Sequence, residues 1–286
     1  RGELLTHLLQ SQPIDTPPTL APITPIEPTT TALDDTAPPK TAKTKPTKIT
    51  PKQREFRDKL KQGSNGPVML ELAGGTVELG SNLQLGTDEQ PKYKTTLAPF
   101  ALGKYEITQA EYRLYITAVG KTWAPSGNND PLPATNLSWQ DAQDYATWLS
   151  AQTGQRYRLP REAEWEYAVA GGSGNLYWWG RSAKVGMANC FNCGPNLGRT
   201  PLPIGQFAAN PYGLHDLTGN VREWVQDCYT NSYKNRDQPQ AADCGLRSIR
   251  GGGYDSPMDS LRTTKRDKAA PSTALDNLGF RVARDL

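Results

Sequence analysis

The most informative part of the chain reads Tyr212-Gly-Leu-His-Asp-Leu-Thr-Gly-Asn-Val-Arg-Glu-Trp-Val-Gln-Asp-Cys228 and closes, after a second cysteine, on Arg250-Gly-Gly-Gly-Tyr254. It combines a Gly-Asn turn, a carboxylate, a tryptophan typical of protein interiors, two cysteines and three consecutive glycines. Glycine and asparagine favour tight turns, and disulfides or metal ions fix loops that lack regular structure. The pattern therefore favours a loop-rich core tied by disulfides or metal over a helix bundle.

Four motifs resemble, in order, those of the formylglycine-generating enzyme, or sulfatase-modifying factor, family. They are Arg158-Leu-Pro-Arg-Glu-Ala-Glu-Trp-Glu-Tyr-Ala168, Tyr212–Trp224, Arg250–Tyr254 and Asn277-Leu-Gly-Phe-Arg-Val-Ala283. The resemblance extends from about Gly66 to the C-terminus. It implies an α+β, C-type-lectin-like fold with short strands, few helices and much irregular coil.

Composition separates a proline-rich N-terminal part from a globular part. Ten of the 24 prolines lie between Pro13 and Pro51, where no apolar periodicity occurs, so this segment is expected to be a disordered linker. All seven tryptophans follow it. The predicted parts are a short N-terminal segment at 1–12, a Pro/Thr-rich linker at 13–51, a basic helical lead-in at 52–63 and the sulfatase-modifying-factor-like domain at 64–286.

Charge and composition exclude several function classes. From Ser64 onward the chain holds 22 Lys/Arg and 22 Asp/Glu, which gives no basic surface for nucleic acid. No apolar run approaches the ~20 residues of a membrane span. With only His7 and His215, a histidine-rich metal site within one chain is excluded.

Local signals predict several elements. The capping boxes Thr108-Gln-Ala-Glu111 and Ser138-Trp-Gln-Asp141 each begin a helix, the first ending near Val119 and the second at Gly154. Residues 68–80 read as two strands of a hairpin around two glycines, and residues 97–107 as a further strand.

Two motifs have a structural and a functional interpretation. The carboxylates of residues 162–166 suggest acid–base chemistry, but nearby arginines favour structural ion pairs. Tyr177-Trp178-Trp179 could stack on a sugar or peptide, and we favour core packing. Arg281 is expected to hold the last strand.

The four cysteines predict two disulfides. Gly194-Pro195 follows Cys190-Phe-Asn-Cys193, which indicates a loop and a structural disulfide, although redox or zinc chemistry stays open. Cys228 and Cys244 are then left to pair across a 17-residue loop, worth about 3 kcal/mol. Sequence alone allows three connectivities. An even number of cysteines favours an oxidising, extracytoplasmic location, either periplasmic or at the cell surface.

The Gly-Asn turn is a candidate calcium site. An asparagine oxygen, a carboxylate three residues later and turn carbonyls are the hard ligands that Ca²⁺ prefers. The resemblance implies calcium at Asn220 and Glu223, with carbonyls of Gly219 and Val221. In the alternative interpretation, Glu223 pairs with an arginine and Asn220 occupies a left-handed turn.

The oxidases of the family carry two copper-binding cysteines just after the glycine-rich turn. Here these positions fall on Ser256 and Leu261, and no cysteine follows Cys244. Cu(I) requires thiolate ligands, so no copper and no oxidase activity are expected.

The remaining polar loop suits recognition of a protein, a peptide or a small polar ligand. Its candidate binding residues are Tyr254, Asp255, Ser256, Met258, Asp259, Arg262, Lys265, Arg266 and Asp267. We therefore expect a non-catalytic sensor or regulatory domain, with a membrane tether, a Ser/Thr kinase or a secretion-system regulator upstream of Arg1. The alternatives are an oxidase or maturation enzyme, or a structural envelope component.

Overall fold

The computed structural model describes residues 53–125, 127–235 and 243–286, and these form an α+β domain. The segments predicted at 1–12 and 13–51 lie outside the described residues. No helix in the described ranges combines the length and the apolar character needed to cross a membrane.

The two capped helices are present as predicted. Helix α1 (Gln109–Val119) begins after Thr108, whose hydroxyl accepts the N–H of Glu111 while that carboxylate accepts the N–H of Thr108. Helix α2 (Trp139–Thr153) begins after Ser138 in the same way. Both end at a glycine in the left-handed conformation, which costs glycine no steric strain. Local sequence is therefore sufficient to set these boundaries.

Short strands form three separate sheets. The five-stranded sheet is antiparallel, with the order β1 (Glu55–Phe56), β2 (Met69–Leu72), β5 (Phe100–Gly103), β11 (Ala283–Asp285) and β6 (Tyr157–Arg158). The four-stranded sheet has the order β10 (Leu278–Phe280), β7 (Arg222–Cys228), β8 (Arg247–Arg250) and β9 (Asp267–Ala269), and only its β10–β7 pair is parallel. The third sheet pairs β3 (Gly75–Leu79) with β4 (Tyr93–Leu97).

The helical lead-in predicted at 52–63 is wrong. Residues 55–56 form strand β1, paired with β2, and Leu60 is buried in the core. The side chain of Asp58 accepts a hydrogen bond from Tyr157 at 2.7 Å. The ordered domain thus begins at least eleven residues before the predicted boundary at Ser64, because sheet pairing overrides a weak helical pattern.

The predicted hairpin around Gly74-Gly75 is wrong in its pairing. Both strands exist, but β2 pairs with β5 and β3 pairs with β4. A Cβ at Gly74 would lie 2.4 Å from the carbonyl oxygen of Leu97, so the glycine allows the backbones to approach there. Gly74 and Gly75 therefore lie where the chain leaves the five-stranded sheet and enters the β3–β4 sheet.

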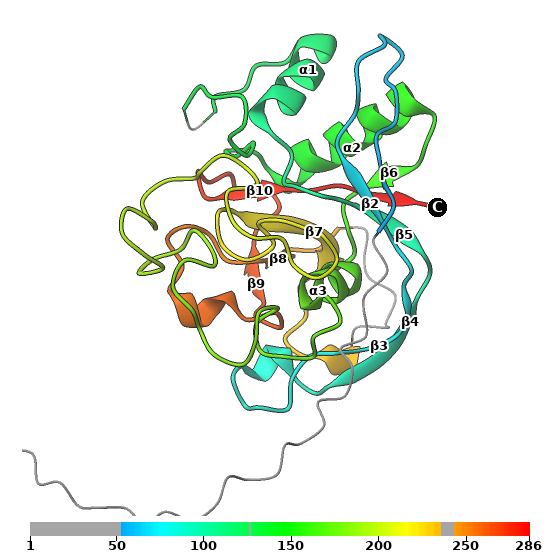
Figure 1. Cartoon of the computed structure of the whole chain (residues 1–286). Helices are drawn as coiled ribbons and strands as arrows, with labels where there is room; N and C mark the ends of the chain where they lie inside the picture. The colour runs from blue at the N-terminus through cyan, green and yellow to red at the C-terminus, as the bar shows by residue number, and fades with distance from the viewer. Residues whose placement is uncertain (1–52, 126, 236–242) are drawn as a thin grey trace, which may run out of the picture. The chain divides into compact units, whose positions relative to one another are not determined.

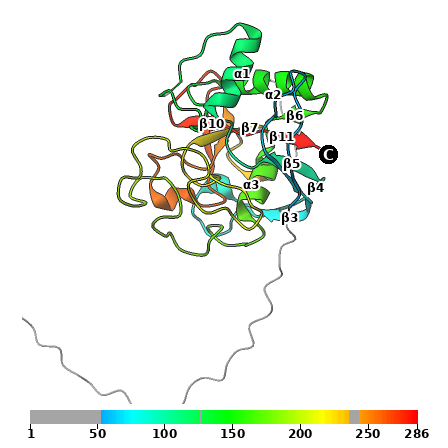
Figure 2. The ribbon, with the colours of Figure 1, turned by 45° about the horizontal axis from the view of Figure 1, so that its top comes forward.

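Two hydrophobic cores lie on opposite faces of the sheets. Successive strand residues point to opposite sides, so on β7 Trp224 belongs to the core under α1 and α2, and Val225 to the core under α3 (Glu162–Ala170). Figure 1 shows α1 and α2 together on one side of β7 and β10, with α3 on the other, and Figure 2 keeps this separation.

A third hydrophobic cluster supports the loops. Its buried members are Tyr177, Ala188, Cys190, Cys193 and Leu261, and Trp179 packs against them. The rings of Tyr177 and Trp179 stack with centroids 5.0 Å apart. Core packing of this aromatic run, favoured from the sequence, is therefore confirmed for these two residues.

Candidate functional site

The glycine-rich turn after β8 brings together Ser256 and Leu261, which stand where the family's oxidases carry their copper-binding cysteines. Gly252 has a φ of 70°, a left-handed conformation that favours glycine. A Cβ built there would lie 2.6 Å from Cδ2 of Leu261 and 3.4 Å from Cβ of Ser256. The side chains of Ser256 and Leu261 thus converge on one point.

Neither side chain is suited to hold copper. Ser256 is 4% exposed, and its Oγ accepts the N–H of Gly253 at 3.0 Å and a guanidinium N–H of Arg222 at 3.1 Å. Leu261 is 2% exposed and packs in the third hydrophobic cluster. A hydroxyl already engaged by two donors and a hydrocarbon do not replace two thiolates, so the residues present do not fit a Cu(I) site.

A shallow cleft of about 120 Å³ lies beside this turn, lined by charged residues of three strands and loops. At its rim Arg222 bonds to Asp255 at 3.0 Å and lies 3.6 Å from Asp267. Lys265 also lines the cleft, and its ammonium forms no ion pair with any described residue. The cleft therefore presents one lysine ammonium that has no ion-pair partner among the described residues, beside the backbone of the glycine turn, while Arg222 contacts two carboxylates.

The predicted binding surface is partly a buried one. Arg266 is 2% exposed, with its guanidinium enclosed by Glu162 and two carbonyls. Ser256 is buried as described above, and Met258 packs against the third hydrophobic cluster. Arg262 reaches the fully buried Glu89 at 2.6 Å. Ser256 and Arg266 therefore stabilise the loop from within, and direct ligand binding by either residue stays a prediction.

Four of the predicted residues do lie at the surface. Asp255, Asp259 and Asp267 are exposed, and Lys265 is partly exposed. Tyr254 is partly buried, and burial together with a hydrogen bond to Asp276 raises the pKa of its hydroxyl to about 12. Its hydroxyl therefore stays protonated at neutral pH and can donate or accept a hydrogen bond.

Phe191 is a surface residue that the sequence interpretation missed. It is 52% exposed, its backbone N–H donates to the carbonyl of Ser256 at 3.0 Å, and it forms a parallel bridge with Pro257. The flanking cysteines of the Cys-x-x-Cys motif are buried. The signal available in the sequence was an apolar residue between two cysteines, which are buried while the ring of Phe191 is exposed.

The predicted disulfides are both present. Cys190 bonds to Cys193 and Cys228 bonds to Cys244. Of the described residues, no cysteine remains free. The first disulfide is part of the third hydrophobic cluster. The second links the last residue of β7 to the loop just before β8.

The Gly-Asn turn engages both of its predicted side-chain calcium ligands with protein donors. Asn220 has a φ of 61°, and its Oδ1 accepts the N–H of Leu202 at 2.9 Å. The carboxylate of Glu223 accepts two hydrogen bonds from Arg281, at 2.8 and 2.6 Å. Within the described ranges, no three His, Cys, Asp or Glu side chains are placed to hold a metal ion.

This arrangement does not fit a calcium site of the predicted composition. It matches the alternative interpretation, a left-handed turn with an arginine-paired carboxylate, and it agrees with the structural role expected for Arg281. Calcium binding at this turn stays a prediction, which calorimetry on chelator-treated protein tests.

Three carboxyl groups share one arginine beneath this turn. Glu106 and Asp216 are buried next to Glu223 and Arg281. Burial, reinforced by the negative charges of Asp216 and Glu223, raises the pKa of Glu106 well above its usual value. Burial also raises the pKa of Asp216. Glu106 and Asp216 are therefore more readily protonated in the folded than in the unfolded chain.

The carboxylates of α3 form structural ion pairs, as the sequence favoured. Their partners come from β6, β8 and the loop that follows β8. These ion pairs therefore hold the interior residues that lie beneath the surface around the glycine-rich turn. The pairs are Arg158–Glu164 at 2.7 Å, Arg250–Glu166 at 2.7 Å, Arg266–Glu162 at 2.7 Å and Arg250–Glu162 at 3.4 Å. Because all are nearly excluded from solvent, removing one partner would leave a buried charge.

Comparisons with known proteins agree with the resemblance seen in the motifs. Residues 53–286 match the family described as "Sulfatase-modifying factor enzyme 1-like domain". The structure of PvdO from Pseudomonas aeruginosa superposes with a TM-score of 0.72 at 32% sequence identity, covering 82% of this chain and 98% of that one.

Curated relatives include formylglycine-generating enzymes, inactive enzymes and kinases. "Inactive C-alpha-formylglycine-generating enzyme 2" of Bos taurus is 28% identical, and the matched region covers 75% of this chain and 87% of that protein. "Serine/threonine-protein kinase pkn1" of Chlamydia caviae is 35% identical, and the matched region covers 76% of this chain and 38% of the kinase. The chain thus spans well under half the length of the chlamydial kinases.

Proposed function

The chain belongs to the family of sulfatase-modifying factor enzyme 1-like domains, and from this premise we propose that it is a non-catalytic binding domain. It holds a protein, a peptide or a small polar ligand against the surface around the glycine-rich turn. One observation carries the proposal: the side chains that converge over Gly252 are a serine engaged by two donors and a buried leucine.

The surface is suited to a partner with an acidic group beside an apolar one. Lys265 supplies an ammonium that forms no ion pair with a described carboxylate, and Phe191 supplies an exposed ring on the adjoining loop. Aromatic side chains are enriched at protein interfaces, and polar residues form the rim around them. Tyr254 and Asp255 complete the polar rim.

An extracytoplasmic location and a tether upstream of Arg1 belong to the same proposal. Two disulfides suit an oxidising environment. Similarity to the chlamydial kinases supports a role as the sensor part of a larger protein, and similarity to the bovine inactive enzyme supports loss of catalysis.

The catalytic alternative is tested with copper and a Cys-x-Pro-x-Arg peptide. The wild-type protein is expected to bind no stoichiometric copper at this turn and to form no aldehyde on the peptide. The double variant Ser256→Cys, Leu261→Cys restores two thiols over Gly252 and serves as the positive control for copper binding. Aldehyde formation by the wild-type protein would overturn the proposal.

The binding surface is tested by selection from a displayed peptide library. Selected peptides are expected to bind saturably, and Lys265→Glu combined with Phe191→Ser to weaken that binding by ~10-fold or more. Lys61→Glu, an exposed lysine elsewhere, is the matched control. Equal affinity of all three proteins would show that this surface is not the binding site.

A further inference from the structure

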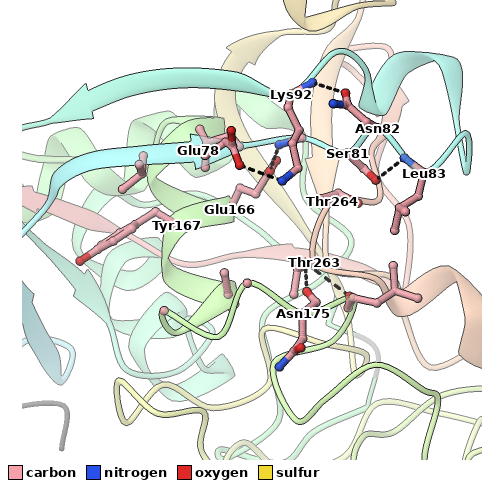
Figure 3. A pocket seen from close by; sticks show the side chains of 17 residues that line it. Glu78, Ser81, Asn82, Leu83, Lys92, Glu166, Tyr167, Asn175, Thr263 and Thr264 are labelled. Atoms are coloured by element: carbon pink, nitrogen blue, oxygen red, sulfur yellow. Dashed lines mark hydrogen bonds and ion pairs between the residues drawn. The ribbon is translucent and has the colours of Figure 1, made fainter. Parts of the chain in front are cut away.

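A second cavity, larger than the cleft at the glycine-rich turn, has a volume of about 460 Å³ (Figure 3). It lies between β3, the loop that follows β3 and the end of α3. Its apolar walls come from Val77 and Leu79 of β3, Ala170 of α3, Leu176 and the ring of Tyr167. The volume falls in the range of about 300–1,000 Å³ typical of sites for small organic molecules.

Gly174 leaves its part of the cavity wall without a side chain. Gly174 lines the cavity in a left-handed conformation, with a φ of 61°. A Cβ built there would meet no atom within 4 Å. The space beside Gly174 is therefore open, and a neighbouring side chain does not fill it.

The polar groups on the floor of the cavity are already satisfied. Glu166 accepts the N–H of Gly80 at 2.5 Å and pairs with the buried Arg250 at 2.7 Å. Thr263 donates to neighbouring carbonyls, and Thr264 donates to the buried Glu89 at 2.6 Å. A ligand would therefore find no uncompensated charge on the floor.

The mouth offers neutral hydrogen-bonding groups. Its one ion pair joins Lys92 and Glu78 at 2.7 Å, so the two charges compensate each other. The side-chain amide of Asn175 has no hydrogen-bond partner among the described residues, and the amide N–H₂ of Asn82 has none within the same ranges. Figure 3 shows Asn82 beside Lys92 and Asn175 on the far side of Thr263 and Thr264 from it.

We infer that this cavity binds a neutral organic molecule with an apolar body and one or two hydrogen-bonding groups. The apolar walls exclude water from the body of the ligand, and the two asparagines bond its polar groups. A charged group carried between the apolar walls would be buried without a counter-ion, which is unfavourable, because the charges on the floor and at the mouth are already paired. This site is separate from the surface around Lys265 and does not depend on its function.

The test compares two fluorescent probes with the same ring system. N-phenyl-1-naphthylamine is neutral, and 1-anilinonaphthalene-8-sulfonate adds one negative charge. Fluorescence titration of the wild-type protein is expected to give one saturable site for the neutral probe, with the sulfonate binding ~10-fold more weakly or worse. No saturable binding of the neutral probe, or tighter binding of the sulfonate, would overturn the inference.

Two variants locate the binding. Ala170→Leu fills the cavity from the end of α3 and is expected to weaken the neutral probe ~10-fold or more, whereas Ala118→Leu, at an exposed site of α1, leaves it unchanged. Leu83 lies at the mouth and is 68% exposed, so Leu83→Glu adds a charge there without disturbing the core. Leu114→Glu, on the exposed face of α1, is its control.

Leu83→Glu keeps the test decisive if Ala170→Leu does not fold, as circular dichroism would show. Weakened binding in the cavity variants with unchanged binding in both controls supports the site. Equal binding of the neutral probe by Leu83→Glu and the wild-type protein would place the probe elsewhere and refute the inference.

Discussion

Replacing Arg281 with methionine is expected to lower the free energy of unfolding by about 3–5 kcal/mol. Arg281 is fully buried and donates to both carboxylate oxygens of Glu223 and to the carbonyls of Gly103 and His215. Without it, Glu223 would stay buried with only the indole N–H of Trp165 as donor among the described residues. An uncompensated buried carboxylate is the source of the loss.

Urea unfolding followed by tryptophan fluorescence measures this change, and thermal melts give a second reading. For a domain of this size each kcal/mol shifts the melting temperature by about 2–4 °C, so a fall of roughly 10 °C is expected. Arg156→Met is the matched control, because Arg156 is 81% exposed and pairs with Asp285 at 3.3 Å. Such an exposed pair contributes about 0–1 kcal/mol.

A loss below about 1 kcal/mol in Arg281→Met would refute this reasoning, since it lies under the range expected for breaking a buried pair. Glu223 would then have another partner, and calcium is the one that the sequence suggests. The unfolding series is therefore run with added calcium and with EGTA. A marked loss of wild-type stability in EGTA alone would support the calcium ligands predicted at the Gly-Asn turn.

Three further changes test other parts of the domain. Because burial raises the pKa of Glu106 in the folded chain, the stability that this group contributes is present at low pH and is lost as the pH rises through the raised pKa. The variant Glu106→Gln should therefore flatten this part of the pH profile of the free energy of unfolding, measured with urea. An unchanged slope would contradict the raised pKa of Glu106. Thr108→Ala removes the cap of α1 and should cost ~1 kcal/mol in chemical unfolding, whereas Thr117→Ala, on an exposed face, should cost little; equal effects would argue against the capping role. Cys228→Ser with Cys244→Ser should cost about 2–4 kcal/mol by the same measurement, and stability equal to wild type would rule out a stabilising disulfide.

Sequence was sufficient where the decisive contacts are local. The capping boxes at Thr108 and Ser138 fix the start of each helix through bonds that span three residues. The thiol positions of the family fall on Ser256 and Leu261 by motif alone. A short, self-contained pattern can be read without knowing what packs against it.

Sequence failed where partners are distant along the chain. Residues 52–63 read as a helix because an apolar spacing of four is visible, whereas the pairing of Phe56 with Met69 is not. Likewise, nothing in the spacing of Arg266 shows that its guanidinium meets Glu162, 104 residues earlier. A charged residue in a loop therefore looked like ligand-binding surface when it is part of the interior.

The ion pairs between α3 and the loop after β8 have a consequence for variation. Because Arg250 and Arg266 anchor that loop from below through Glu162 and Glu166, an outward side chain without an ion pair, such as that of Lys265, contributes little to holding its shape. Positions such as Lys265 can be exchanged freely while the backbone keeps its course. A combinatorial library built on those outward positions should yield folded proteins with many different specificities.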